Sequence, residues 1–245
     1  MKHLLIIGRE GAGKTTLIKR LIQTLRNRSI DGFVTEEYRD NASRVGFWLS
    51  PLDGRQMLLA HRDLATGIRV GPYKVNTAVL EEFAIPVIQR AKTASRILFL
   101  DELGRMELSS PRFAQAVREA FDKGPRVVAT ASIAPMAFLN ALKQRRDVEL
   151  IPLTASNREW VAEELGERLQ MLCAEDALAH KLERQADRIC ELIVADQAPL
   201  LDIEIQQATL HEAVRHAFPE KPQLYQLLYE IRFRRLWQQF RHETV

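Results

Sequence analysis

The chain has 245 residues, of which 46% are hydrophobic and 27% charged, and its formal net charge is +3. This length allows one or two domains with a substantial core, and so small a charge does not by itself indicate a nucleic-acid partner. The apolar run at the N-terminus ends at Gly8, too early for a signal peptide, and no segment approaches the length of a membrane span. Cys173 and Cys190 match no metal or redox spacing, which indicates reduced thiols in a cytoplasmic protein.

The first predicted unit is a strand, a glycine-rich turn and a helix. Residues 3–7 form a short apolar run typical of a buried parallel strand, and residues 16–28 carry apolar side chains on one helical face. Between them, Gly8–Thr15 reads GREGAGKT and fits the pattern G-x-x-x-x-G-K-[ST]. The glycines let successive N–H groups point at phosphate oxygens, and the helix N-terminus adds partial positive charge.

This loop predicts a nucleotide site. Lys14 can reach the β- and γ-phosphates, and the Thr15 hydroxyl can ligate Mg²⁺. The residues that we expect to contact the nucleotide are Gly8, Arg9, Glu10, Gly11, Ala12, Gly13, Lys14, Thr15 and Thr16.

A run of short extended segments comes next. Residues 31–38 and 44–49 read as strands, Asp53-Gly54 is a hairpin turn signal, and residues 56–61 form the return strand. Residues 68–75 add a further extended piece. We therefore expect an antiparallel β insertion beside the main sheet, followed by a helix that Asn76 or Thr77 caps and that ends near Lys92.

Strands and helices then alternate. Strands are predicted at residues 96–100, 126–131 and 148–153, with helices from Pro111 to about Lys123 and from about residue 135 to 144. Ser110 before Pro111 is a helix-start signal, and Ser156–Glu159 fits a capping box that opens another helix. This alternation predicts an α/β fold with a mostly parallel sheet covered by helices on both faces.

The C-terminal part reads as helix only. No glycine occurs after Gly166, and we place the domain boundary between residues 1–170 and a helical extension at 171–245. Helices are predicted around a seam from Leu178 to Ile193, from Asp202 to Phe218, and from Gln223 to about His242. The last helix is apolar on more than one face, which predicts that it packs on the α/β domain, on a second copy in a dimer, or on a partner protein. Its arginines (Arg232, Arg234, Arg235 and Arg241) are typical of a solvated helix face and do not indicate nucleic acid.

The strand at residues 96–100 ends in two carboxylates, which are the expected partners of a phosphate loop. Asp101 can hold Mg²⁺, and Glu102 can polarise the water that attacks the γ-phosphate. Their alternative role is a pair of solvated strand-end carboxylates. An adjacent acid also indicates that the strand at residues 126–131 lies between this strand and the loop strand, where Thr130 or Ser132 could sense the γ-phosphate.

Several segments resemble one family of nucleoside-triphosphatases, the THEP type, whose vertebrate relatives are called cancer-related nucleoside-triphosphatases. The resemblance covers residues 1–170 and rests on the phosphate loop and on five further segments, GFVTEEYR (32–39), RVGF (44–47), VGPYKV (70–75), DELGRMEL (101–108) and NR (157–158). It implies Mg²⁺-dependent hydrolysis of nucleoside triphosphates, ATP and GTP among them, on a RecA-like P-loop sheet. The chain departs from the family pattern at residues 41–43, where a glycine before Arg44 is absent, at Pro72 in place of lysine, and at Arg105 in place of lysine.

Three arginines, Arg39, Arg44 and Arg105, are candidates to stabilise charge on the transferring phosphoryl group. Their alternative is ordinary surface arginine. Glu36 and Glu107 could orient these arginines or be solvated.

These features predict a Mg²⁺-dependent P-loop nucleoside-triphosphatase. Two other functions fit the same residues. One is a small-molecule or nucleotide kinase in which the β insertion forms the acceptor site. The other is a nucleotide-dependent switch or assembly factor that acts through the helical tail.

Overall fold

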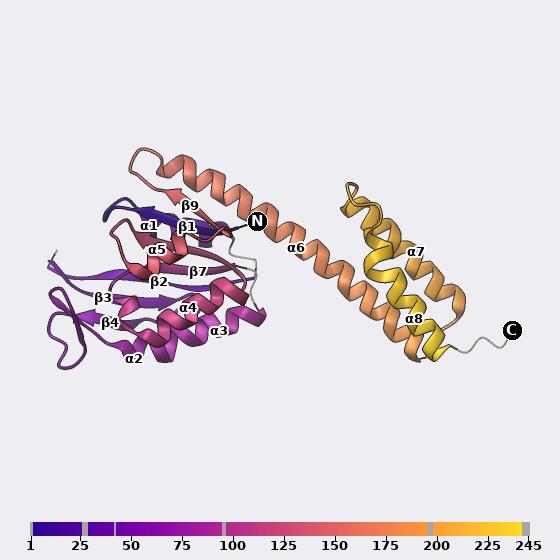
Figure 1. The fold of residues 1–245 in the computed structure, drawn as a ribbon, viewed down its shortest axis with the longest axis horizontal. Helices are drawn as coiled ribbons and strands as arrows, with labels where there is room; N and C mark the ends of the chain where they lie inside the picture. The colour runs from indigo at the N-terminus through magenta and orange to yellow at the C-terminus, as the bar shows by residue number, and fades with distance from the viewer. Residues whose placement is uncertain (1, 26–28, 42, 95–96, 196–197, 242–245) are drawn as a thin grey trace. The chain divides into compact units, whose positions relative to one another are not determined.

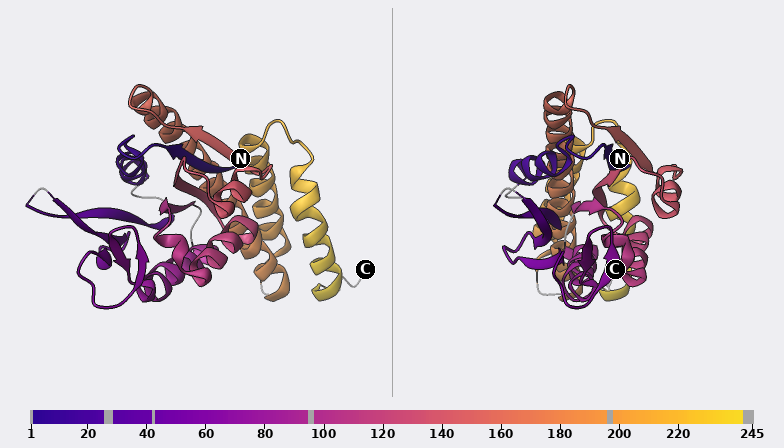
Figure 2. Two further views of the ribbon diagram at one scale, coloured as in Figure 1. Left: turned by 60° about the vertical axis from the view of Figure 1, so that its left-hand side comes forward. Right: turned by 90° about the vertical axis from the view of Figure 1, so that its left-hand side faces the viewer.

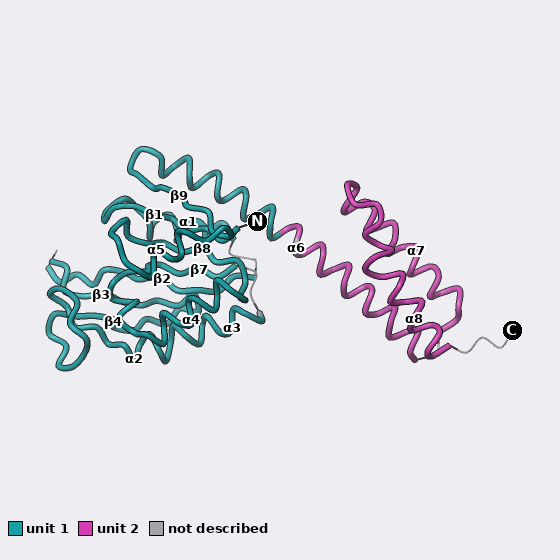
Figure 3. Tube along the Cα trace, in the orientation of Figure 1, with its two compact units in different colours: residues 1–173 teal, residues 174–245 magenta. Residues whose placement is uncertain are grey.

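The structure is a computed structural model that describes residues 2–25, 29–41, 43–94, 97–195 and 198–241. The chain divides into two compact units, unit 1 at Met1–Cys173 and unit 2 at Ala174–Val245 (Figure 3). The predicted element ends at Arg28, Arg96 and His242 fall outside the described residues.

Unit 1 is built on a nine-stranded sheet with the order β5-β6-β4-β3-β2-β7-β8-β1-β9 (Figure 1). The strands are β1 (His3–Gly8), β2 (Ile30–Asp40), β3 (Ser43–Pro51), β4 (Met57–His61), β5 (Ile68–Val70), β6 (Tyr73–Val75), β7 (Ile97–Leu103), β8 (Arg126–Ser132) and β9 (Val148–Pro152). Strands β2, β7, β8, β1 and β9 pair in parallel, whereas β3 to β6 pair antiparallel. The predicted α/β sheet with its antiparallel insertion is thereby confirmed, and β8 lies between β1 and β7 as the adjacent carboxylates indicated.

Helices cover both faces of this sheet (Figure 2). They are α1 (Lys14–Thr24), α2 (Thr77–Val79), η1 (Leu80–Ala84), α3 (Ile85–Ala94), η2 (Glu107–Ser109), α4 (Pro111–Lys123), α5 (Ala137–Lys143) and α6 (Arg158–Ala195). Because neighbouring strand residues point to opposite faces, Leu5 joins the core beneath α3 and α4, while Leu4 and Ile6 join the core beneath α1 and α6. Both cores meet the strands that carry the site.

The helix-start signals differ in outcome. Ser110 caps α4 as predicted, since its hydroxyl accepts a hydrogen bond from the Phe113 N–H at 3.2 Å with Pro111 in the first turn. The predicted capping box at Ser156 is wrong: α6 begins at Arg158, and the Ser156 hydroxyl instead pairs with that of Thr154. Asn157 secures the loop before α6, because its side chain accepts from the Thr154 N–H and donates to the Pro152 carbonyl.

Helix α6 continues from unit 1 into unit 2 without a break. The predicted helix near residue 156 and the predicted seam from Leu178 are one helix of 38 residues, so the predicted boundary at 170 lies inside it. Residues up to Cys173 belong to the unit 1 core, where Leu169 and Cys173 are buried. No helix in the described part of the chain has the length and apolar character that crossing a membrane requires.

Unit 2 consists of the end of α6 with α7 (Leu200–Ala217), η3 (Gln226–Glu230) and α8 (Ile231–Phe240). Tyr225, Tyr229 and Phe233 recur every four residues and form the buried face of the last helical segment. On its other side Leu227 and Leu228 are exposed. Thus the prediction that this helix is apolar on more than one face holds within unit 2.

Candidate functional site

The loop between β1 and α1 has the backbone conformation that its glycines permit. Gly11 and Gly13 have φ values of 78° and 94°, in the left-handed region that other residues avoid. At Gly8, an added Cβ would lie 2.8 Å from the carbonyl oxygen of Leu153, so only glycine fits between β1 and the segment after β9. The turn therefore presents backbone N–H groups at the N-terminus of α1, where anions bind.

Lys14 is the first residue of α1 and is held over this loop. Its side chain is 7% exposed, and Nζ donates to the carbonyls of Gly8 and Arg9, each at 3.3 Å. The same nitrogen lies 3.5 Å from the Glu102 carboxylate. The carbonyl partners hold the Lys14 side chain at the mouth of the loop, where phosphate oxygens would collect.

Asp101 lies near the end of β7 and is completely buried. Its Oδ1 accepts a hydrogen bond from the Thr130 hydroxyl on β8, whereas Oδ2 has no hydrogen-bond partner among the described residues. Burial raises the pKa of Asp101 to about 6, against the opposing effects of the Thr130 and Thr15 hydroxyls. A buried carboxylate oxygen without a partner, next to the Thr15 hydroxyl, fits the oxygen ligands that Mg²⁺ prefers. Thr15 and Asp101 are the residues that could hold this ion.

Glu102 follows Asp101 through a cis peptide bond and lines the cavity beside Lys14. Its side chain is 29% exposed, so a water molecule can approach the carboxylate. Because Asp101 is buried and Glu102 is open to the cavity, the two neighbouring acids have different surroundings. That difference allows one to serve as a metal ligand and the other to orient water.

Lys14 and Glu102 border a cavity of about 710 Å³. It is lined by nine of the predicted site residues, namely Glu10, Gly11, Gly13, Lys14, Thr15, Thr16, Arg44, Glu102 and Arg105. The other predicted residues, Gly8, Arg9, Ala12, Arg39 and Asp101, do not line it. Gly8 and Asp101 are buried, whereas Arg9 and Arg39 are exposed.

The three candidate arginines are not equivalent. Arg44 lines the cavity and is held on several sides: it pairs with Glu10 and with Glu37, the latter at 3.0 Å, bonds the Tyr73 hydroxyl at 3.2 Å, and lies over the Phe47 ring. These partners raise its pKa further above the ordinary arginine value. Arg39 pairs with Glu37 and is 57% exposed, away from the cavity.

Arg105 lies at the cavity and has neither a hydrogen bond nor an ion pair within the described part of the chain. It is therefore free to meet a ligand. Glu37 is the acid that pairs with Arg39 and Arg44, whereas Glu36 pairs with Lys19 and with the Ser50 hydroxyl and with none of the three arginines among the described residues. Glu107 is neither solvated nor paired with an arginine among the described residues.

Sequence reasoning missed part of the wall. Phe47, Tyr73 and Thr35 line the cavity from the β insertion, and the buried Thr35 hydroxyl has no hydrogen-bond partner among the described residues. The sequence segments that contain these three residues were recognised as motifs. Their place in the cavity wall could not be predicted, because it depends on β2, β3 and the β5–β6 turn facing the phosphate loop. Of the two small polar residues on β8, Thr130 holds Asp101 and Ser132 reaches the cavity.

The strand–loop–helix at Lys14, together with the carboxylates of β7 one strand beyond β8, defines a P-loop nucleoside-triphosphatase fold. A family model described as NTPase matches residues 3–166. The nucleoside-triphosphatase THEP1 of Thermotoga sp. (strain RQ2) is 41% identical over 162 residues, which cover 66% of this chain and 92% of that protein.

Two solved structures agree with this match. The crystal structure of THEP1 from Aquifex aeolicus has a TM-score of 0.61 at 34% identity and covers 66% of this chain and 96% of its own. The solution structure of a human cancer-related nucleoside triphosphatase has a TM-score of 0.62 at 32% identity and covers 70% and 98%. The chain belongs to the NTPase family, as the resemblance predicted, and the family match ends before unit 2.

Proposed function

We propose that this enzyme hydrolyses nucleoside triphosphates, ATP and GTP among them, to the diphosphate and phosphate in a Mg²⁺-dependent reaction. The observation that carries the proposal is the meeting of Lys14 and Glu102, 3.5 Å apart, in front of the buried Asp101. The family match and the nucleoside-triphosphatase names of the similar proteins support the same reaction.

In the proposed mechanism the loop N–H groups and Lys14 bind the β- and γ-phosphates. Thr15 and Asp101 hold Mg²⁺, which neutralises phosphate charge when bound. Glu102 orients water and accepts its proton at the carboxylate oxygen facing the cavity. Arg44 and Arg105, which also line the cavity, stabilise charge on the transferring phosphoryl group.

The test is a set of variants assayed for phosphate release and nucleotide binding. Lys14→Ala should abolish hydrolysis without unfolding the protein, since Lys14 contributes a charge and not a core side chain. Glu102→Gln should lower kcat by about 10²–10⁴-fold while Mg²⁺–nucleotide binding persists. Wild-type turnover in either variant would refute the assignment.

Variants of Arg44 and Arg39 form a matched pair that tests whether Arg44 contributes to hydrolysis from the cavity wall. Arg44→Ala should lower kcat by about 10-fold or more, because the guanidinium faces the cavity. Arg39→Ala, which changes the β2 residue that pairs with Arg44 but does not line the cavity, serves as the control and should keep wild-type kcat. Equal effects would show that Arg44 acts only through the insertion's stability.

A second candidate function is phosphoryl transfer to a small hydroxyl-bearing acceptor. Its support is the extension of the cavity beyond the phosphate loop, where Thr35, Phe47 and Tyr73 also line it. A transferase releases phosphate to water slowly until its acceptor is present. Addition of a panel of nucleosides and sugars should then divert the γ-phosphate into a new phosphoester, whereas unchanged release of inorganic phosphate would exclude the panel.

We further propose that unit 2 pairs with a second copy of the chain through the outer face of η3 and α8. Leu227 of η3 and Ile231 of α8, 66% and 48% exposed, border a hollow of about 420 Å³. Glu230 and Arg234 pair along the same helix at 3.0 Å. In a two-fold antiparallel arrangement the Glu230 of one copy would face the Arg234 of the other, so the face is self-complementary.

Light scattering of the full chain tests this pairing. We expect a dimer that the double variant Leu227→Lys, Ile231→Lys converts to a monomer with unchanged kcat. A full-length protein that is monomeric at about 100 μM, where even weak pairs of micromolar Kd associate, would exclude the pairing. Cys173 and Cys190 are buried and form no disulfide within the described part of the chain, which supports the proposal that the enzyme works in the reducing cytoplasm.

A further inference from the structure

The cavity contains one buried carboxyl group to which the mechanism assigns no role. Glu107, the first residue of η2, lines the cavity and is only 2% exposed. It forms no ion pair with any described residue, and the charges of Glu102 and Asp101, which act on its carboxyl, are both negative. A buried acid without a cation is costly, so its place calls for a physical reason.

Its geometry shows what the carboxyl does to the backbone. Oε2 accepts a hydrogen bond from the Gly104 N–H at 3.0 Å, and the Leu108 N–H donates to the Gly104 carbonyl at 3.0 Å. A Cβ added at Gly104 would lie 2.9 Å from the same Oε2, so the carboxyl occupies the space of the missing side chain. The chain thus turns tightly directly after Glu102, around the Glu107 side chain.

This turn lies between the cavity and the hydrophobic core. Glu102 and Arg105 line the cavity, Leu108 packs against the core beneath α3 and α4, and Met106 does both. The position of Glu102 relative to Lys14 therefore depends on how the next residues of the chain are held. Displacement by about 1 Å of a group that orients a reactant costs on the order of 10²-fold in rate.

We propose that Glu107 is a positioning residue for hydrolysis: through its hydrogen bond to the Gly104 N–H it holds the turn that places Glu102 and Arg105 at the γ-phosphate end of the cavity. The inference rests on the proposed role of Glu102 and deepens it.

The carboxyl performs this role as a neutral acid. Burial raises the pKa of Glu107 to about 8, against the opposing effect of the backbone N–H groups of Glu107 and Gly104. The charges of Glu102 and Asp101, both acids, act in the same direction as burial. Because an uncharged oxygen acceptor is what the turn needs, the amide of glutamine can replace it, whereas alanine cannot.

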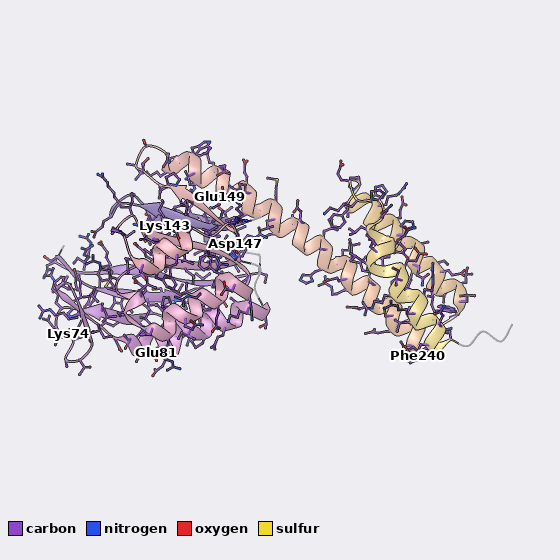
Figure 4. The ribbon with its side chains drawn as sticks, in the orientation of Figure 1. Lys74, Glu81, Lys143, Asp147, Glu149 and Phe240 are labelled. Atoms are coloured by element: carbon purple, nitrogen blue, oxygen red, sulfur yellow. The ribbon has the colours of Figure 1, made fainter. Side chains whose placement is uncertain are left out.

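The test compares Glu107→Ala, Glu107→Gln and a control, with kcat and KM measured for each. The control is Glu81→Ala. The Glu81 carboxylate accepts a hydrogen bond from the Ser110 hydroxyl at 3.0 Å but does not line the cavity (Glu81 is labelled in Figure 4). Glu107→Ala should lower kcat by about 10–100-fold with KM changed less than about threefold. Glu107→Gln should restore kcat to within about threefold of wild type, and the control should keep wild-type kcat.

Two outcomes overturn the inference: a wild-type kcat in Glu107→Ala, or a kcat in Glu107→Gln as low as in Glu107→Ala. If Glu107→Ala does not fold, Glu107→Asp replaces it, since the shorter acid keeps the ionisable group but loses reach to Gly104. The inference then requires the aspartate variant to be slower than the glutamine variant. Glu102→Gln is assayed in parallel, because wild-type turnover in that variant would refute the proposed function, whereas a loss confined to it would refute only the positioning role.

Discussion

The properties of the site depend on individual polar side chains that the fold buries away from water. Lys14, Asp101 and Thr130 are 7%, 0% and 0% exposed, so each depends on the few partners that surround it. A hydrogen bond to a charged group in such surroundings contributes more than one at the surface, and its loss leaves a desolvated group behind. Substitutions at the supporting residues should therefore change ligand binding as well as stability.

Thr130→Val tests this at Asp101. The change removes the hydroxyl that donates to Oδ1 while keeping the side-chain volume, so the carboxylate is less well oriented for Mg²⁺. We expect Mg²⁺–nucleotide binding to weaken by about 10–100-fold. Titration calorimetry measures it, with Thr130→Ser as the control that keeps the hydroxyl. Unchanged affinity in Thr130→Val would show that Asp101 needs no orienting partner.

Glu107 predicts a specific pH dependence of stability. Its pKa is raised from the ordinary value of 4.5 to about 8, so the folded state binds this proton more tightly than the unfolded state does. The resulting stabilisation is complete below about pH 4.5 and is lost as pH rises towards 8, by at most about 1.4 kcal/mol per pH unit. Glu107→Gln lacks this titration. Urea denaturation at pH 5.5, 7.0 and 8.5 should therefore show the wild type losing stability relative to the variant, and parallel curves would contradict the buried neutral acid.

At the scale of elements, the helices that frame the site begin in different ways. Helix α4 begins with a side-chain cap at Ser110, whose hydroxyl both accepts from the Phe113 N–H and donates to Glu81. Helix α6 begins after a loop that Asn157 secures from outside the helix. Local sequence signals were similar at both starts, but the surroundings of the two serines differ: Ser110 is buried and Ser156 exposed.

Ser110→Ala and Ser156→Ala form a matched pair for this difference. Loss of a buried cap should cost Ser110→Ala about 1–2 kcal/mol of unfolding free energy. Ser156→Ala removes only an exposed hydroxyl contact and should change stability by less than about 0.5 kcal/mol. Urea denaturation of both variants is the measurement, and equal losses would restore the capping box at Ser156.

The molecule as a whole combines a catalytic unit with a helical unit joined by one continuous helix. The match covers 92% of the Thermotoga relative over 162 residues, so a member of the family can consist of little more than the matched region. The core of unit 1 nevertheless extends past the family match at residue 166, because Leu169 and Cys173 on α6 are 0% and 5% exposed.

Two truncations test where unit 1 ends. A chain that stops after Cys173 should fold and hydrolyse nucleotide with the kcat of the full chain. A chain that stops at Gly166 loses the buried Leu169 and Cys173 and should be less stable by about 2–5 kcal/mol, as for the removal of a large core side chain. Thermal unfolding of the two compares them, and equal stability would place the boundary before Leu169.

Much of the fold follows from local patterns. Strand β1, its glycine loop and α1 are adjacent in the chain, so the spacing alone brings Lys14 and Thr15 to the N-terminus of a helix. The adjacent acids after an apolar strand likewise predicted the position of β8 between β7 and β1, because parallel sheets of this kind place strand ends along one edge. The continuity of α6 was missed, although residues 158–195 contain no proline to end a helix.

By itself, the sequence determined the phosphate loop, the carboxylate pair, the mixed sheet and the helical tail, since each depends on residues close together in the chain. The tertiary structure decided which of the equivalent residues reach the cavity. Arg44 reaches it and Arg39 does not, although the two residues pair across β2 and β3, and the turn after Glu102 buries Glu107 against Gly104. These outcomes depend on contacts between segments that are distant in the sequence or that fold back on themselves. Composition and periodicity do not indicate which face of a segment such a contact covers.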